Sequence, residues 1–159
     1  MTEPPAPGVA RIVADADVLC ADLLCGGAAR EALDLVRAHS WTTLVASDLL
    51  LADAEATIAA LADGGLAADW RTKVEELAEL VEHPPGDHPA LASAYRGDAR
   101  HVLSLDDRLT SARAGAAIRG RVETSVKHPR AFARLFDPER VYPVAVGGEY
   151  PGPDRDPRE

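Results

Sequence analysis

The sequence predicts an α/β protein with a central, mostly parallel sheet of about five strands. Two observations support this fold class. Short apolar runs alternate along the chain with longer stretches of helical periodicity, which is typical of βα units. At 159 residues the chain is also the size of a single domain with one substantial core. We therefore expect one sheet, covered by the helices that connect its strands.

The expected strands are the short apolar runs rich in β-branched residues, because such side chains favour pleated, buried positions. The first two are RIVA and WTTLVA, and the third is a short strand within LAELVEH. HVLSL and VETSV complete the set. The five strands fall within residues 11–14, 41–46, 77–83, 101–105 and 122–126.

The expected helices lie between these strands and are marked by capping residues. Residues 18–39 read as one helix, or as two helices broken at Gly26-Gly27. Ser47 caps a helix that runs through about Leu61 and that Asp63-Gly64-Gly65 ends. Asp87 caps a short helix with Pro89 in its first turn. Further helices are expected at 67–77, 107–120 and 129–136.

The chain ends differ from its centre in composition. Residues 1–10 and 145–159 are rich in Pro, Gly or charge, which predicts flexible segments around one folded domain at 11–144. No segment approaches the roughly 20 apolar residues that span a bilayer. The N-terminus also lacks the basic and apolar regions of a signal peptide. We expect a cytoplasmic protein with no membrane contact.

The charge composition is acidic and nearly free of lysine. The formal net charge is −9, Asp outnumbers Glu by 15 to 11, and only 2 of the 17 basic residues are Lys. Abundant Asp with little Lys is typical of a halophilic host or a GC-rich genome. This balance argues against broad electrostatic binding of nucleic acid, which needs a basic surface. The objection weakens in a salty cytoplasm, where screening lengths fall to about 3 Å at 1 M salt.

Several aspartates follow or flank the predicted strands. Asp15 and Asp17 follow the first, Asp106 and Asp107 follow the fourth, and Asp53 and Asp87 lie on helices nearby. In open parallel sheets ligands gather at the carboxyl ends of the strands, so neighbouring first and fourth strands would bring these acids to one crevice. Clustered carboxylates repel one another. Oxygen ligands suit Mg²⁺ or Mn²⁺, which would neutralise them.

Five segments in order give a more specific indication: VADADVL, SDLLLADAE, DHPALASA, HVLSLDDRL and VETSVKHPRAFARLF. Together they resemble the PIN domain, a family composed largely of metal-dependent ribonucleases. The resemblance spans about residues 11–136. It implies a three-layer α/β/α fold, an RNA substrate and a Mg²⁺ or Mn²⁺ cofactor. An antitoxin-like protein partner and a homodimer are further arrangements that the resemblance suggests.

The resemblance also assigns roles to individual residues. The catalytic and metal-binding acids are Asp15, Asp53, Asp87 and Asp106. The second acid is commonly Glu in the family, so the shorter Asp53 is a departure, and Glu55 is the alternative at that point. Ser104, Asp17 and Asp107 are expected to support the metal ligands. Asp107 is also expected to serve as a turn or cap residue. Arg108 and Arg100 are the candidates for binding RNA phosphates.

Other interpretations stay open from the sequence. Asp87 could serve only as a helix cap, and the Asp53 departure could mark a PIN-like module with weakened catalysis that binds RNA or protein. DADVL, LVAS, Lys73 and SLDD also resemble, in order, motifs of haloacid-dehalogenase-type phosphatases, in which Asp15 would be the nucleophile and Asp17 the acid/base. The five histidines show no zinc-type spacing and are expected in loops or on the surface.

Overall fold

A computed structural model, which describes residues 7–82, 89–106 and 125–157, confirms the α/β prediction. The described sheet has five parallel strands in the order β3-β2-β1-β4-β5. The strands are β1 (Arg11–Ala14), β2 (Thr43–Ser47), β3 (Glu79–Val81), β4 (His101–Leu103) and β5 (Ser125–Lys127). Strands β1 and β4 are neighbours, with Ala14 opposite Leu103. The carboxyl ends that precede Asp15 and Ser104 therefore lie side by side.

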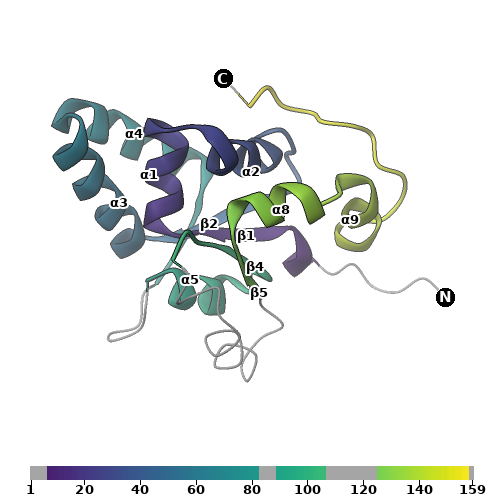
Figure 1. Cartoon of the computed structure of the whole chain (residues 1–159). Coiled ribbons are helices and arrows are strands. Elements are labelled where there is room, and N and C mark those ends of the chain that lie inside the picture. Colours follow the sequence, from purple (N-terminus) through teal and green to yellow (C-terminus); the bar gives the residue numbers. More distant parts are fainter. Residues whose placement is uncertain (1–6, 83–88, 107–124, 158–159) are drawn as a thin grey trace.

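Helices cover both faces of the sheet in three layers (Figure 1). On one face lie α1 (Ala16–Leu24), α2 (Gly27–Arg37) and α8 (Pro129–Leu135), and on the other lies α5 (Pro89–Gly97). A helical pair formed by α3 (Asp48–Leu61) and α4 (Gly64–Leu77) flanks the sheet. The short α9 (Pro138–Ala145) and a 3-10 turn at Pro7–Ala10 pack together. In the part of the chain described, no helix is long and apolar enough to cross a membrane.

Two details refine the helix predictions. The segment 18–39 is two helices, because Gly26 and Gly27 take positive φ angles of 77° and 59° that break the first helix. Asp63, expected to end a helix, instead begins the next one, and its side chain accepts a hydrogen bond from the Leu66 N–H at 2.9 Å. Helix α9 was not predicted, although Asp137 caps it and Pro138 begins it.

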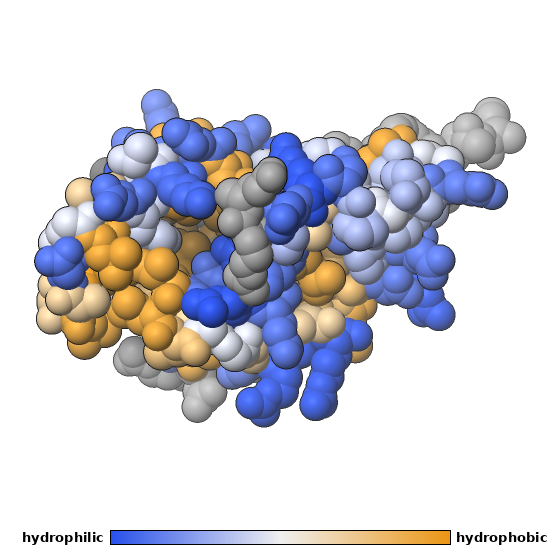
Figure 2. All heavy atoms as spheres, turned by 90° about the horizontal axis from the view of Figure 1, so that it is seen from above, coloured by the Kyte–Doolittle hydropathy of each residue, from blue (hydrophilic) through white to orange (hydrophobic). Residues whose placement is uncertain are grey.

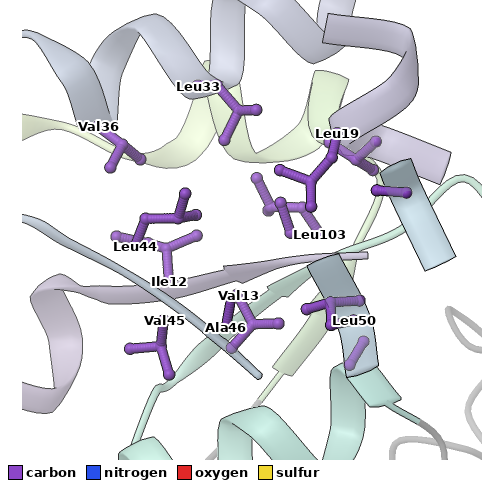
Figure 3. Close-up of a cluster of buried hydrophobic side chains, with 14 of the residues drawn as sticks. Ile12, Val13, Leu19, Leu33, Val36, Leu44, Val45, Ala46, Leu50 and Leu103 are labelled. Atoms are coloured by element: carbon purple, nitrogen blue, oxygen red, sulfur yellow. The ribbon is translucent and has the colours of Figure 1, made fainter. Parts of the chain in front are cut away.

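The core lies between the sheet and its covering helices (Figure 3). Ile12, Leu44 and Leu103 point toward Leu33 and Val36 of α2, and all five are at most 3% exposed. On the opposite face Val13 and Val45 point toward α5. Each fully buried aliphatic side chain of this kind contributes about 1.5–3 kcal/mol. This packing fixes β1 and β4 in the positions that carry the aspartates.

The C-terminal segment, expected as a flexible tail from residue 145, is held against the end of α2. The backbone N–H groups of Asp154 and Arg155 donate to the Ala38 carbonyl at 3.0 and 3.1 Å. The Asp154 carboxylate accepts hydrogen bonds from the N–H and the hydroxyl of Ser40. The last carbonyls of a helix lack partners within it. The docked C-terminal segment therefore supplies hydrogen-bond donors to the Ala38 carbonyl at the end of α2.

Two histidines are less exposed than the sequence suggested. His39 is 3% exposed, with its ring bonded to the Leu35 carbonyl and the Tyr150 hydroxyl. His101 lies on β4, where its Nε2 donates to the Val9 carbonyl at 3.0 Å. Its Nδ1 lies 3.3 Å from the Lys127 ammonium. Burial and the charge of Lys127 lower the pKa of His101 from 6.5 to about 4.

This shift predicts acid sensitivity of the fold. As the pH falls below about 6.5, His101 becomes protonated in the unfolded chain, whereas in the folded protein it stays neutral until the pH reaches about 4. The free energy of unfolding should therefore fall by about 2–3 kcal/mol over that window. His101→Gln keeps a donor toward Val9 but cannot titrate. Urea denaturation across the window should show a shallower slope for this variant, whereas equal slopes would assign the acid sensitivity to other groups.

Candidate functional site

Asp15 stands at the carboxyl end of the central strand β1 and caps helix α1. Its Oδ1 accepts a hydrogen bond from the Ala16 N–H at 2.8 Å. Its own N–H donates to the Leu103 carbonyl at 2.8 Å, which ties it to the neighbouring strand β4. The residue is only 8% exposed. A carboxylate is thus fixed, nearly buried, at the junction of two parallel strands and the start of a helix, where the helix dipole favours negative charge.

Ser104 links this carboxylate to the chain that follows β4. The fully buried Ser104 hydroxyl donates to Asp15 Oδ2 at 3.0 Å and accepts from the Asp106 N–H at 3.0 Å. The Ser104 N–H donates to the Lys127 carbonyl at 3.1 Å, so the turn is also anchored to β5. The Ser104 hydroxyl therefore holds both the backbone N–H of Asp106 and the carboxylate of Asp15.

Asp17 joins the group from the first turn of α1. Its Oδ1 accepts a hydrogen bond from the Leu105 N–H at 3.3 Å. Burial raises the pKa of Asp17 above its usual 3.8, and the charges of Asp15 and Asp106 raise it further, while backbone hydrogen bonds oppose the shift. The structure therefore brings Asp17 close to both Asp15 and Asp106 at the carboxyl ends of β1 and β4.

Asp53 is placed differently from the other acids. It lies exposed on α3, where its carbonyl accepts a hydrogen bond from the Thr57 hydroxyl. It is not among the charges that shift the pKa of Asp17. The alternative, Glu55, lies 3.5 Å from Arg71 on α4 and belongs to the contact between α3 and α4. The described contacts therefore do not join Asp53 or Glu55 to the group at Asp15.

The remaining predicted residues divide into two groups. Asp87, Asp107 and Arg108 lie outside the described residues. Arg100 precedes β4, and its N–H donates to the Gly8 carbonyl at 3.2 Å, at the opposite end of the strand from Asp106. The backbone N–H of Leu105 is a site group that sequence patterns cannot reveal, because every residue except Pro carries one.

The donor chemistry of the site suits a hard divalent cation. Asp15, Asp17 and Asp106 offer only oxygen ligands, which Mg²⁺ and Mn²⁺ prefer. Such a cation would relieve the repulsion of Asp17 by Asp15 and by Asp106. Within residues 7–82, 89–106 and 125–157, however, no three acid, His or Cys side chains already stand at metal-binding distances. The oxygen atoms of the described acids therefore suit Mg²⁺ or Mn²⁺, but the described residues do not by themselves form a complete set of metal ligands.

A large hollow lies away from these acids, between α1, α2, α4 and the C-terminal segment. Its volume is about 1170 Å³, and Leu23, Leu33 and Trp70 are among its apolar lining residues. Figure 2 shows apolar side chains gathered on the α3 and α4 side of the molecule, next to this region. Lys73 also lines the hollow, on α4. A phosphatase site would need this lysine beside Asp15, so its position weighs against that interpretation.

Comparison with known proteins places the chain in a protein family. The model of a family of unknown function, DUF7384, matches residues 6–158. The chain belongs to DUF7384. The match covers the sheet, the acid group and the C-terminal segment that docks on α2. No curated protein and no solved structure matches the chain.

The crowding of charge predicts that Asp17→Asn stabilises the fold. A folded-state pKa above 3.8 means that ionising Asp17 costs the folded state free energy as the pH rises. With chelator present, we therefore expect the melting temperature of Asp17→Asn at pH 7 to lie above that of the wild type. The gain should shrink as the pH falls toward 3.8. A lower melting temperature at every pH would instead mean that the carboxylate matters mainly as the acceptor of the Leu105 N–H.

Proposed function

We propose that this DUF7384 protein is a metal-dependent endoribonuclease that resembles PIN domains in its site. The observation that carries the proposal is the group formed by Asp15, Asp17 and Asp106 at the carboxyl ends of β1 and β4, joined through the buried Ser104. Three interacting carboxylates held by backbone and hydroxyl donors are an unfavourable arrangement for stability alone. Such arrangements are typical of sites that bind a cation.

The chain's own residues would divide the work of phosphodiester hydrolysis. Asp15 and Asp106 would hold Mg²⁺ or Mn²⁺, with Asp87 the further acid that the resemblance assigns. When bound, such a cation polarises a phosphoryl oxygen and lowers the pKa of a coordinated water. Ser104 would keep the Asp15 carboxylate in one orientation by its hydrogen bond. Asp17 would hold the turn at Leu105 in place and adjust the charge of the site.

A second candidate function rests on the position of Asp53. If the exposed Asp53 takes no part in the site, the number of metal ligands falls and the cation binds weakly. The protein would then be a PIN-like module that binds RNA or protein without cutting it. Binding without cleavage is the result that separates the two candidates.

The test is a cleavage assay on the full chain. Single-stranded and stem-loop RNAs, labelled at one end, are incubated with Mg²⁺, Mn²⁺ or EDTA over a range of salt concentrations, beside a generic phosphomonoester. Internal cleavage that requires a divalent cation supports the nuclease. RNA binding by filter retention without cleavage supports the module. Turnover of the phosphomonoester alone would contradict both and would favour the phosphatase.

A further inference from the structure

The open edge of the sheet at β3 carries a small acidic and apolar surface, which we call the β3 edge surface. Strand β3 is outermost in the sheet order, and no other strand of the described chain pairs with its outer side. Beside it is a hollow of about 610 Å³. The hollow is lined by Asp48, Leu49, Leu80, Val81 and Glu82. Unpaired strand edges are templates on which another chain can add a strand.

Two leucines give this surface its apolar character. Leu49 at the start of α3 is 44% exposed, and Leu80 in the middle of β3 is 45% exposed. Single exposed leucines scattered over a surface need no explanation, but Leu49 and Leu80 line the same hollow. We therefore regard them as part of a contact site. An added strand would place alternate side chains against them.

The charges of the β3 edge surface have one sign. Asp48 and Glu82 line the hollow, and none of its described lining residues is basic. Arg71 lies 3.2 Å from Asp48 but is shared with Glu55 and Glu75, so it neutralises only part of three carboxylates. Such a surface attracts a basic partner and repels the phosphates of RNA.

The same charges disfavour a second copy of this chain as the partner. Pairing two β3 edges would bring Glu82 and Asp48 of one copy close to the same acids of the other, and like charges across an interface are unfavourable. A short, acidic edge strand is a usual defence against self-association. It does not exclude a strand that carries positive charge.

We propose that the β3 edge surface binds an extended segment of another protein that carries apolar and basic residues on one strand face, because Leu80 and Glu82 are two residues apart and share a face of β3. The segment adds as a sixth strand beside β3. Its apolar side chains contact Leu49 and Leu80, and its basic side chains face Asp48 and Glu82. This site is distinct from the carboxylate group at Asp15, so it stands or falls independently of the nuclease proposal.

The test uses the full protein and a fluorescein-labelled peptide of the repeat Val-Thr-Arg-Thr (the Val-Arg peptide), which puts Val and Arg on the same face of a strand. Fluorescence anisotropy should report a dissociation constant of about 10–100 µM in low salt that weakens as salt is added. Leu80→Asp and Glu82→Lys should each weaken binding by about tenfold or more. The matched controls, Leu61→Asp at a leucine that is 71% exposed elsewhere and Glu139→Lys on α9, should leave binding within about twofold.

Further arms separate strand addition from simple charge attraction. A peptide with Pro at its centre loses a backbone donor and should bind much more weakly, and one with Glu in place of Arg should not bind. Amide hydrogen exchange at residues 79–82 should slow when the Val-Arg peptide is present. The proposal is overturned by no binding up to about 1 mM, by equal binding of the Pro peptide, by loss in neither surface variant, or by a labelled RNA competing for the same surface.

Discussion

Asp15→Asn is expected to reduce metal-dependent RNA cleavage by roughly 100-fold or more, because it removes the best-fixed charge of the proposed cation site. The substitution is close to isosteric, and Asn is as good a helix cap as Asp. The hydrogen bond from the Ala16 N–H to the side-chain oxygen can therefore survive. The loss should appear in initial cleavage rates at saturating Mn²⁺. The melting temperature, measured beside it, reports the cost of the hydrogen bond that the Ser104 hydroxyl loses, because the Asn side chain has only one acceptor oxygen.

The matched control is Asp63→Asn. Asp63 also caps a helix through its carboxylate, at the start of α4, but it takes no part in the group at Asp15. We expect its cleavage rate to be within about twofold of wild type. If Asp15→Asn cleaves RNA as fast as Asp63→Asn, the proposed role of the carboxylate group is wrong. Asp53→Asn measures the departure at the second acid: an effect as large as that of Asp15→Asn would require Asp53 to reach the site during turnover.

The parts of the fold that local sequence determines were predictable. β1 follows from the apolar run RIVA, and the end of α3 at Leu61 follows from a helical pattern capped at Ser47. The placement of Asp15 beside Ser104 required one further assumption, that the first and fourth strands are neighbours, which the sheet order confirms. The sequence predicts the place of Asp15 because this residue comes immediately after the last residue of β1.

Other features depend on contacts between distant residues, which composition does not reveal. The C-terminal segment is rich in Pro and Gly, yet Asp154 meets Ser40 across 114 positions of sequence. The direction of the Asp53 side chain depends on how α3 is rotated about its axis. Moving one position along a helix changes the direction of a side chain by about 100°. Glu55 contacts Arg71 only because α4 folds back against α3. These outcomes follow from tertiary packing.

Gly97→Ala is expected to destabilise the fold by about 1–3 kcal/mol or more, the usual cost of overpacking a core. Gly97 ends α5 where this helix lies against β2. A Cβ added there would lie 2.3 Å from Cγ1 of Val45 and 3.3 Å from its Cβ. Val45 is fully buried, so it has little room to move. Replacing Gly by Ala inside a helix normally stabilises it by about 0.5–1 kcal/mol. A loss of stability in Gly97→Ala would therefore show that the clash with Val45 outweighs the higher helix propensity of Ala.

Two companions make this prediction specific. Gly64→Ala, in the first turn of α4, meets nothing within 4 Å and should be neutral or slightly stabilising. Val45→Ala alone should cost about 2 kcal/mol through the cavity it leaves. Because it also removes the atom that clashes, the double variant with Gly97→Ala should be more stable than the sum of the two losses predicts. Urea denaturation of the four proteins measures this coupling. Strict additivity would mean that α5 moves away from β2 and that the close approach at Gly97 does not constrain the sheet beneath the Asp15 site.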